Sequence, residues 1–328
     1  MATYKEIQGT AIQNFAGDPA NPITGQVWYD SVAATFQYRK ESTAGAWATG
    51  GALNAARNNI VGTGIKTAAL AFGGQTPPYA QSALTESYNG TSWTEVNDLT
   101  TARGQGGTAG VQTSSLFFGG NTFPGPVVAI TESWNGTSWT EVADLNTARR
   151  LLGGAGASKT DALAIGGLNT GGATTAETET WNGTSWTEVN NLNTSRRNAA
   201  GIGAVTTAAL AAGGYTTAGL VVVESWNGTS WTEIADLNTV RAGLGGGSGT
   251  QTSALVFGGS GTALTESWNG SAWTEVADMS VVKETLGTST GPNNTSALAF
   301  GGSNPGGFES ATEEWSSPAT SNETITTS

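Results

Sequence analysis

A six-residue segment, Trp134-Asn135-Gly136-Thr137-Ser138-Trp139, recurs along the chain at almost constant intervals. Related copies occupy residues 88–93, 181–186, 226–231 and 268–273. In each copy an Asn-Gly pair separates two short runs that favour β-strands. This is a strong signal for a tight hairpin, because both turn residues adopt positive φ at low cost. The aromatic residues that flank the turn should face each other across the hairpin. The sequence therefore predicts a repeated β-hairpin.

The repeat extends well beyond this hairpin. Tryptophans occur at positions 47, 93, 139, 186, 231 and 273, at intervals of 46, 46, 47, 45 and 42 residues. An apolar run that ends in Gly-Gly also recurs, at residues 73–74, 119–120, 166–167, 213–214, 258–259 and 301–302. Each unit has room for four strands, and such a unit cannot bury both of its faces alone. Packing several units around an axis would bury them.

This pattern resembles the kelch repeat, in which an apolar strand ends in Gly-Gly, the third strand carries an aromatic residue and the fourth strand carries a tryptophan. The resemblance covers residues 45–315 in six copies. It implies an all-β chain that forms a single β-propeller of four-stranded blades.

The two ends of the repeat region complement each other. The last unit contains Gly301-Gly302 and Trp315 but no later tryptophan strand, whereas Trp47 has no Gly-Gly pair before it. We therefore expect six blades, with the Trp47 strand closing the last one. The alternative is seven blades, in which residues 4–50 form a degenerate first blade and residues 324–327 complete the last. The expected division is an N-terminal anchor with an extra hairpin in residues 1–40 and a propeller in residues 41–328.

Composition restricts the chemistry that the chain can perform. The 328 residues carry a formal net charge of −12 and include no cysteine and no histidine. The charge disfavours nucleic acid and anionic membranes as partners. The missing residue types remove thiol chemistry, the commonest metal ligand and the usual general base. They also rule out the ligands that copper-radical kelch oxidases need. No apolar run reaches membrane-spanning length. We expect a non-enzymatic protein without metal or cofactor.

One face of the propeller should carry the variable loops. The stretches between Gly-Gly and the glutamate of the next strand contain 11, 11, 11, 9, 6 and 10 residues, whereas the Asn-Gly turns do not vary in length. Variable loops on a rigid scaffold often bind ligands, although loops also drift when nothing constrains them. Tyr79, Phe123 and Tyr215 lie in these loops and are candidates for ligand contact.

A basic residue precedes the first strand of each unit on the same face. These residues are Arg57, Arg103, Arg149, Arg196, Arg241 and Lys283. They could bind an anionic ligand such as an acidic glycan or a peptide carboxylate. Alternatively, each could pair with a glutamate that recurs once per unit, such as Glu86, Glu132, Glu179, Glu224 or Glu266. The tryptophans pose a similar choice between stacking on sugars and packing between the sheets.

Residues 1–40 do not fit the repeat. Two segments, Ala2-Thr3-Tyr4-Lys5-Glu6-Ile7-Gln8-Gly9-Thr10 and Gly25-Gln26-Val27-Trp28-Tyr29-Asp30, resemble the start of tail or other virion proteins of marine bacteriophages. Such proteins often continue into kelch-like repeats of the Leu-Asn-Thr-Ala-Arg type. Residues 26–29 and 35–38 should form a hairpin, with Trp28 and Tyr29 as anchor residues.

This resemblance implies a structural protein of a bacteriophage virion, from the tail or another surface, assembled in the cytoplasm of the bacterial host. Residues 1–40 would bind other virion proteins, and the propeller would be displayed toward a glycan or protein of the host surface. Homo-oligomer formation stays open. The alternative is a soluble kelch-type module that binds a protein partner through its long loops.

Overall fold

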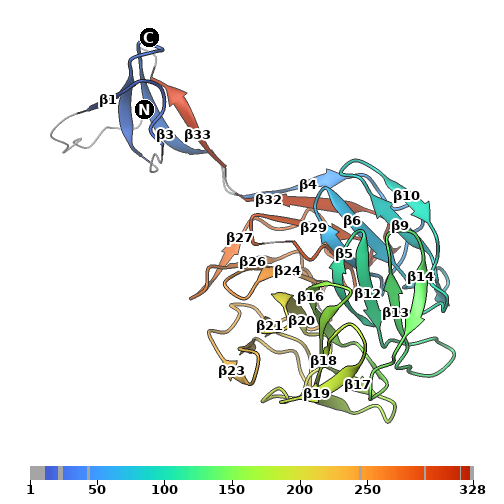
Figure 1. Cartoon of the computed structure of the whole chain (residues 1–328). Helices are drawn as coiled ribbons and strands as arrows, with labels where there is room; N and C mark the ends of the chain where they lie inside the picture. Colours follow the sequence, from blue (N-terminus) through green and yellow to red (C-terminus); the bar gives the residue numbers. More distant parts are fainter. Residues whose placement is uncertain are drawn as a thin grey trace. The chain divides into compact units, whose positions relative to one another are not determined.

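β-Sheets make up the regular structure of this chain, and their described strands pair in antiparallel fashion except for residues 13–15, which pair in parallel with residues 28–30. The computed structural model describes residues 12–20, 25–42, 45–243, 246–291, 293–317 and 319–325, and every regular element in them is a strand. The strands belong to two compact units (Figure 1). The larger unit spans residues 46–316, and the smaller unit combines residues 1–45 with residues 317–328.

The larger unit contains six sheets of four or more strands, each formed mainly by one sequence repeat. The first strands are β5 (Val61–Ile65), β11 (Gly107–Val111), β16 (Gly153–Ser158), β20 (Ala200–Val205), β24 (Gly246–Thr250) and β28 (Gly287–Thr288). The second strands are β6 (Ala68–Phe72), β12 (Ser114–Phe118), β17 (Asp161–Asn169), β21 (Ala208–Ala212), β25 (Ser253–Phe257) and β29 (Ser296–Phe300).

The third and fourth strands form the repeated hairpin. The third strands are β9 (Thr85–Tyr88), β13 (Thr131–Trp134), β18 (Thr174–Trp181), β22 (Val223–Trp226), β26 (Thr265–Trp268) and β32 (Thr312–Ser316). The fourth strands are β10 (Trp93–Val96), β14 (Trp139–Val142), β19 (Trp186–Val189), β23 (Trp231–Glu233), β27 (Trp273–Val276) and β4 (Ala46–Gly50). Short strands extend three of the repeats, namely β7 (Gln75–Thr76) with β8 (Ala80–Gln81), β30 (Ser303–Asn304) with β31 (Gly307–Phe308), and β15 (Arg149–Arg150) with β17.

The sixth sheet joins distant parts of the sequence. Its strand order is β28-β29-β32-β4, and Trp47 of β4 lies directly opposite Trp315 of β32. This is the pairing that the sequence predicts for the Trp47 segment. Tail residues 319–324 pair with a strand of the smaller unit instead, which differs from the role that the seven-blade alternative gives to residues 324–327.

The sheets of the larger unit have a propeller-like arrangement (Figure 1). Each first strand contacts the first strands of the sheets before and after it, and β28 contacts both β24 and β5. Glycines permit this close approach. A Cβ on Gly154 would lie 2.3 Å from the carbonyl oxygen of Thr108, and one on Gly201 would lie 2.5 Å from that of Gly154. Side chains larger than hydrogen at these two positions would therefore force neighbouring sheets apart.

Aromatic side chains fill the space between neighbouring sheets. In the second sheet, the rings of Trp134 and Trp139 have centroids 5.4 Å apart across the hairpin. Trp139 also packs edge-on against Phe72 of the first sheet, at 4.7 Å, and donates from Nε1 to Thr85 Oγ1 at 3.1 Å. These indoles are core residues that join adjacent sheets, so they are not available to stack on sugars.

The turn between the aromatic residues is stabilised by its own asparagine. The Oδ1 atom of Asn135 accepts hydrogen bonds from the backbone N–H groups of Thr137 and Ser138, both at 2.9 Å. Gly136 has a φ of +94°. An Asx turn with glycine at positive φ accounts for the recurring Asn-Gly pair by turn chemistry alone.

The smaller unit is one four-stranded sheet with the order β1-β2-β3-β33. Its strands are β1 (Gln13–Phe15), β2 (Val27–Asp30), β3 (Thr35–Ser42) and β33 (Ala319–Thr324). The β2–β3 hairpin corresponds to the predicted strands at 26–29 and 35–38. The unit differs from the expected anchor of residues 1–40, because it includes the C-terminal segment. The phage-like segment Ala2–Thr10 lies outside the described residues.

Candidate functional site

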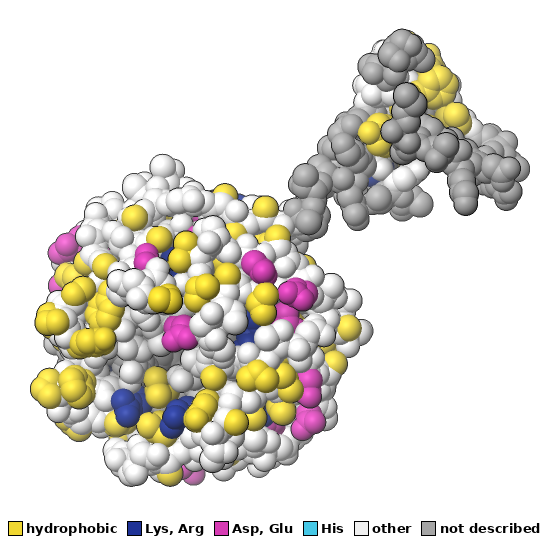
Figure 2. Space-filling view, turned by 180° about the vertical axis from the view of Figure 1, so that it is seen from behind, with side chains coloured by type: hydrophobic (Ala, Val, Ile, Leu, Met, Phe, Trp, Pro, Cys, Tyr) yellow, Lys and Arg dark blue, Asp and Glu magenta, His cyan; other side chains and the backbone are white. Residues whose placement is uncertain are grey.

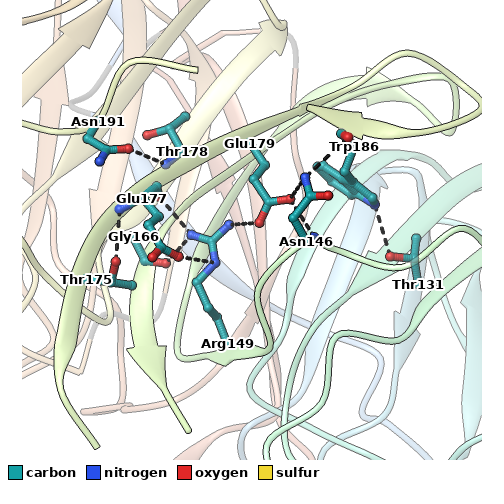
Figure 3. Close-up of polar contacts among 10 residues, drawn as sticks. All are labelled: Thr131, Asn146, Arg149, Gly166, Thr175, Glu177, Thr178, Glu179, Trp186 and Asn191. Atoms are coloured by element: carbon teal, nitrogen blue, oxygen red, sulfur yellow. Dashed lines mark hydrogen bonds and ion pairs between the residues drawn. The ribbon is translucent and has the colours of Figure 1, made fainter. Parts of the chain in front are cut away.

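The segments that connect successive sheets contain the arginine and asparagine positions that recur in the repeats. In the connector that leads to the third sheet, Arg149 Nη1 donates to the carbonyl oxygens of Gly166 and Glu177, both at 2.7 Å (Figure 3). Its Nη2 pairs with Glu179 Oε1 at 2.8 Å. The other oxygen of Glu179 accepts from the backbone N–H and the Nδ2 group of Asn146, at 2.8 and 2.9 Å. The buried carboxylate of Glu179 thus binds both Asn146 and Arg149 of the connector.

The same arrangement recurs around the larger unit. The pairs are Arg57–Glu86 at 2.6 Å, Arg103–Glu132, Arg196–Glu224 at 2.5 Å and Arg241–Glu266 at 3.1 Å. In the sixth sheet Lys283 takes the arginine position and donates from Nζ to the carbonyl oxygen of Ala311 at 2.8 Å. All six basic side chains are fully buried.

Burial lowers the pKa of basic side chains in these connectors. It lowers the pKa of the Arg103 guanidinium below its ordinary value, while the charge and hydrogen bond of Glu132 oppose the shift. Burial also lowers the pKa of Lys283, against the charges of Glu313 and Glu309. These six basic side chains have no solvent-exposed surface, so they cannot contact a ligand from solution. The expectation that these six residues bind an anion is therefore corrected, and glutamate pairing is their role in the five arginine connectors.

Two cations on this face are free of such pairing. The connectors to the third and fourth sheets carry a second arginine, Arg150 and Arg197, and both are half-buried. Arg150 Nη1 donates to Gln105 Oε1 at 3.2 Å, and the Arg197 guanidinium lies over the Tyr215 ring at 4.7 Å. Neither is within 4.0 Å of a carboxylate of the described chain. The doubled arginine in the sequence was the signal that could have identified them.

The three aromatic candidates lie in different surroundings. Tyr79 is 61% exposed and Phe123 is 55% exposed. Both line a pocket of about 390 Å³ together with Arg150. Tyr215 is half-buried beneath Arg197 and does not line this pocket. The structure thus brings together two of the three predicted aromatic contacts, and adds a cation that the sequence prediction did not include.

A second hollow lies where the first strands begin. Its lining includes Asn59, Gln105, Leu151 and Asn198, and its volume is about 130 Å³. These residues have positive φ and form a chain of backbone hydrogen bonds from sheet to sheet. Gln105 N donates to Asn59 O at 3.3 Å, Leu151 N to Gln105 O at 2.6 Å, and Asn198 N to Leu151 O at 2.8 Å. These backbone hydrogen bonds join neighbouring sheets around the hollow.

The predicted anchor residues lie on β2. Trp28 is fully buried within the smaller unit, and Tyr29 packs edge-on against Phe36 with ring centroids 5.2 Å apart. Trp28 therefore supports the sheet from inside. Of the two, only Tyr29 retains exposed surface for contact with another molecule.

Among the described residues, no cluster of three acidic side chains is placed to hold a metal ion. Those residues also include no helix long and apolar enough to cross a membrane. Comparisons of the chain with protein-family models and with curated proteins give no match.

Proposed function

We propose that this protein is a non-enzymatic structural protein of a bacteriophage virion, which displays a six-bladed kelch-type β-propeller for attachment to the host surface. The observation that carries the proposal is the division of the chain into a repetitive body and a separate small sheet. The small sheet is made from both chain ends, so the body is held to it by two covalent connections.

Six blades are supported by the contacts between successive first strands, which run from β5 to β28 and back to β5, and by hydrogen bonds at five of the six junctions between neighbouring sheets. Trp93 of the first repeat donates from Nε1 to Thr312 of the sixth at 3.0 Å, and Trp47 of the sixth donates to Thr265 of the fifth at 3.0 Å. The same tryptophan–threonine bond joins the second, third and fourth sheets to their predecessors. A ring of such sheets leaves only short, protected strand edges and provides a rigid platform for loops.

The proposed anchor is the smaller unit as a whole. It would bind other virion proteins during assembly in the bacterial cytoplasm, and the loop face of the propeller would remain available to a host glycan or protein. Many copies on one particle would raise weak single-site binding by avidity.

Purified particles test this proposal. We expect mass spectrometry of gradient-purified phage to detect the chain. Complementation with Trp28→Ala, which removes the buried centre of the small sheet, should strongly reduce incorporation while the propeller remains folded by circular dichroism. Tyr79→Ala serves as the control, because it changes only the loop face and should be incorporated normally. Absence of the wild-type chain from particles would refute the proposal.

The alternative is a soluble kelch-type module that binds a protein partner through the same loop face. It is favoured by the exposed Tyr79 and Phe123 rings, because exposed aromatic residues are common at protein interfaces. This alternative predicts a free protein that a partner retains in pull-downs and that is absent from purified particles.

A further inference from the structure

The pocket beside Tyr79 and Phe123 is built from three neighbouring repeats. The loop that follows β6 and the loop that follows β12 form its walls, and the connectors to β11 and β16 contribute one side chain each. The lining residues are Gln75, Pro78, Tyr79, Gln81, Gln105, Asn121, Phe123 and Arg150. Its volume of about 390 Å³ is within the range of small-ligand sites.

Two polar atoms of this lining lack a partner in the described chain. Gln81 Oε1 and Arg150 Nε are buried from solvent and accept or donate no hydrogen bond there. Buried polar groups without partners are unfavourable, so they mark positions where a ligand can bind with little competition from the protein. The positive charge of Arg150 is not paired with a carboxylate of the described chain, because its hydrogen-bond partner, Gln105, is neutral.

Two aromatic rings provide flat apolar surfaces at the same place. Tyr79 packs edge-on against Phe308 with ring centroids 5.0 Å apart, which fixes its orientation while leaving most of the residue exposed. Phe123 lies on the neighbouring loop. On one face of the larger unit, Figure 2 shows basic side chains close together beside hydrophobic ones.

We propose that this pocket binds an acidic saccharide, one that carries a carboxylate on its sugar ring. The apolar face of the ring packs on Tyr79 or Phe123, the hydroxyl groups bond to the amide side chains, and the carboxylate pairs with Arg150. The assignment deepens the proposed function by naming the class of host-surface ligand, and its biological setting rests on that function.

The lining favours a saccharide over a peptide. Four amide side chains, Gln75, Gln81, Gln105 and Asn121, line the pocket, and an amide can both donate and accept hydrogen bonds. The oxygens of Gln75, Gln105 and Asn121 each accept one bond within the described chain, whereas that of Gln81 accepts none. Sugar hydroxyls have the same dual capacity and are spaced closely around a ring. None of the described residues that line the pocket carries a carboxylate that would repel an acidic group.

The test uses the full-length protein and defined probes. Calorimetric titration should detect trigalacturonic acid and 3′-sialyllactose, with weaker or no binding of methyl-esterified trigalacturonate and lactose. Arg150→Gln should lower the affinity for the acidic probes by about tenfold or more. Tyr79→Ala should lower the affinity for all probes. Arg197→Gln is the matched control, since it removes the equivalent arginine of the next repeat outside the pocket, and it should bind like the wild type.

The outcomes separate this inference from the proposed function. Loss of acidic-probe binding in Arg150→Gln but not in Arg197→Gln supports the inference. Equal binding of acidic and neutral probes, an unchanged affinity in Arg150→Gln, or binding only of peptides with a free carboxylate overturns it. Detection of the chain in virions is a separate measurement, so a failed titration leaves the virion proposal standing, and the reverse also holds.

Discussion

Trp273 departs from a hydrogen bond that every other fourth-strand tryptophan makes. The Nε1 groups of Trp47, Trp93, Trp139, Trp186 and Trp231 each donate to a threonine of the preceding sheet at 3.0–3.1 Å. The corresponding residue for Trp273 is Val223, and Trp273 Nε1 is buried without a partner. A buried donor that loses its partner destabilises a protein by about 1–3 kcal/mol.

Val223→Thr should therefore stabilise the larger unit, by about 1 kcal/mol, because its hydroxyl supplies the missing acceptor. Urea unfolding followed by tryptophan fluorescence measures the effect. Val256→Thr is the control, since Val256 is equally buried but lies on a second strand, where the hydroxyl meets no such donor. If both variants lose stability to the same extent, the interpretation of the repeated bond is wrong.

Tyr88 is the first-repeat equivalent of the third-strand tryptophans. Its hydroxyl donates to Glu314 Oε1 at 2.6 Å, and burial together with this bond raises the pKa of Tyr88 to about 12. In the unfolded chain the pKa of tyrosine is about 10. Between these values the unfolded state has lost a proton that the folded state retains. The stabilisation is thus complete below pH ~10 and is lost as the pH rises toward ~12.

Tyr88→Phe should be less stable than the wild type by about 1–2 kcal/mol at pH 8, because the bond to a charged acceptor is gone. The difference should shrink steadily above pH 10. Urea unfolding of both proteins at pH 8, 10 and 11 measures it, and the effect of Lys283 cancels because both proteins contain that residue. A difference that does not depend on pH would contradict the assigned cause of the shift.

At the scale of elements, the connector to the sixth sheet differs from the other five. Lys283 replaces the arginine, and Glu313 Oε1 is buried without a hydrogen bond. Glu313 Oε2 still accepts from the backbone and side chain of Ser280, at 2.7 and 2.8 Å. A lysine ammonium cannot span the carbonyl groups and the carboxylate together as a guanidinium does.

Lys283→Arg should complete this connector and raise the free energy of unfolding by about 1–3 kcal/mol, as expected for a hydrogen bond to a charged group. Thermal and urea unfolding provide the measurement. The reverse change, Arg241→Lys in the preceding connector, is the matched control and should destabilise. A loss of stability in Lys283→Arg would show that the sixth connector has no room for the longer head group.

The sequence predicts elements better than it predicts the pocket, for a physical reason. Local turn chemistry determines the hairpins, and hydrophobic periodicity determines the strands that end in Gly-Gly. Residues such as Gly136 and Trp139 therefore predict these elements directly from the sequence. For Arg149 the sequence leaves two alternatives, a pairing with Glu179 or an anionic ligand, because the linear sequence does not show burial. The pocket forms only where Tyr79, Phe123 and Arg150, which belong to three different repeats, lie close together in the fold. No periodic pattern in the sequence indicates that they do.

At the scale of the whole molecule, the sixth sheet of the larger unit is completed by β4, a strand far from the rest of that sheet in the sequence. Trp47 of β4 packs against Trp315 and Phe257 with ring centroids 5.7 and 4.9 Å away. Its Nε1 also bonds to Thr265 of the fifth sheet. Removal of β4 would leave β32 with an unpaired edge and expose the aromatic core between the fifth and sixth sheets.

We therefore expect residues 51–316 to unfold at lower urea concentration and with a broader transition than residues 46–316. Loss of one large aromatic side chain from a core costs about 3–5 kcal/mol, and the open β32 edge is a template for intermolecular pairing. Size-exclusion chromatography with light scattering should show association of the shorter chain, while residues 46–316 remain discrete. Equal stability and equal mass for the two chains would mean that β4 does not close the sheet assembly. The hydrogen bond from Trp93 to Thr312 and the contacts between β28 and β5 would then have to hold the first and sixth sheets together without it.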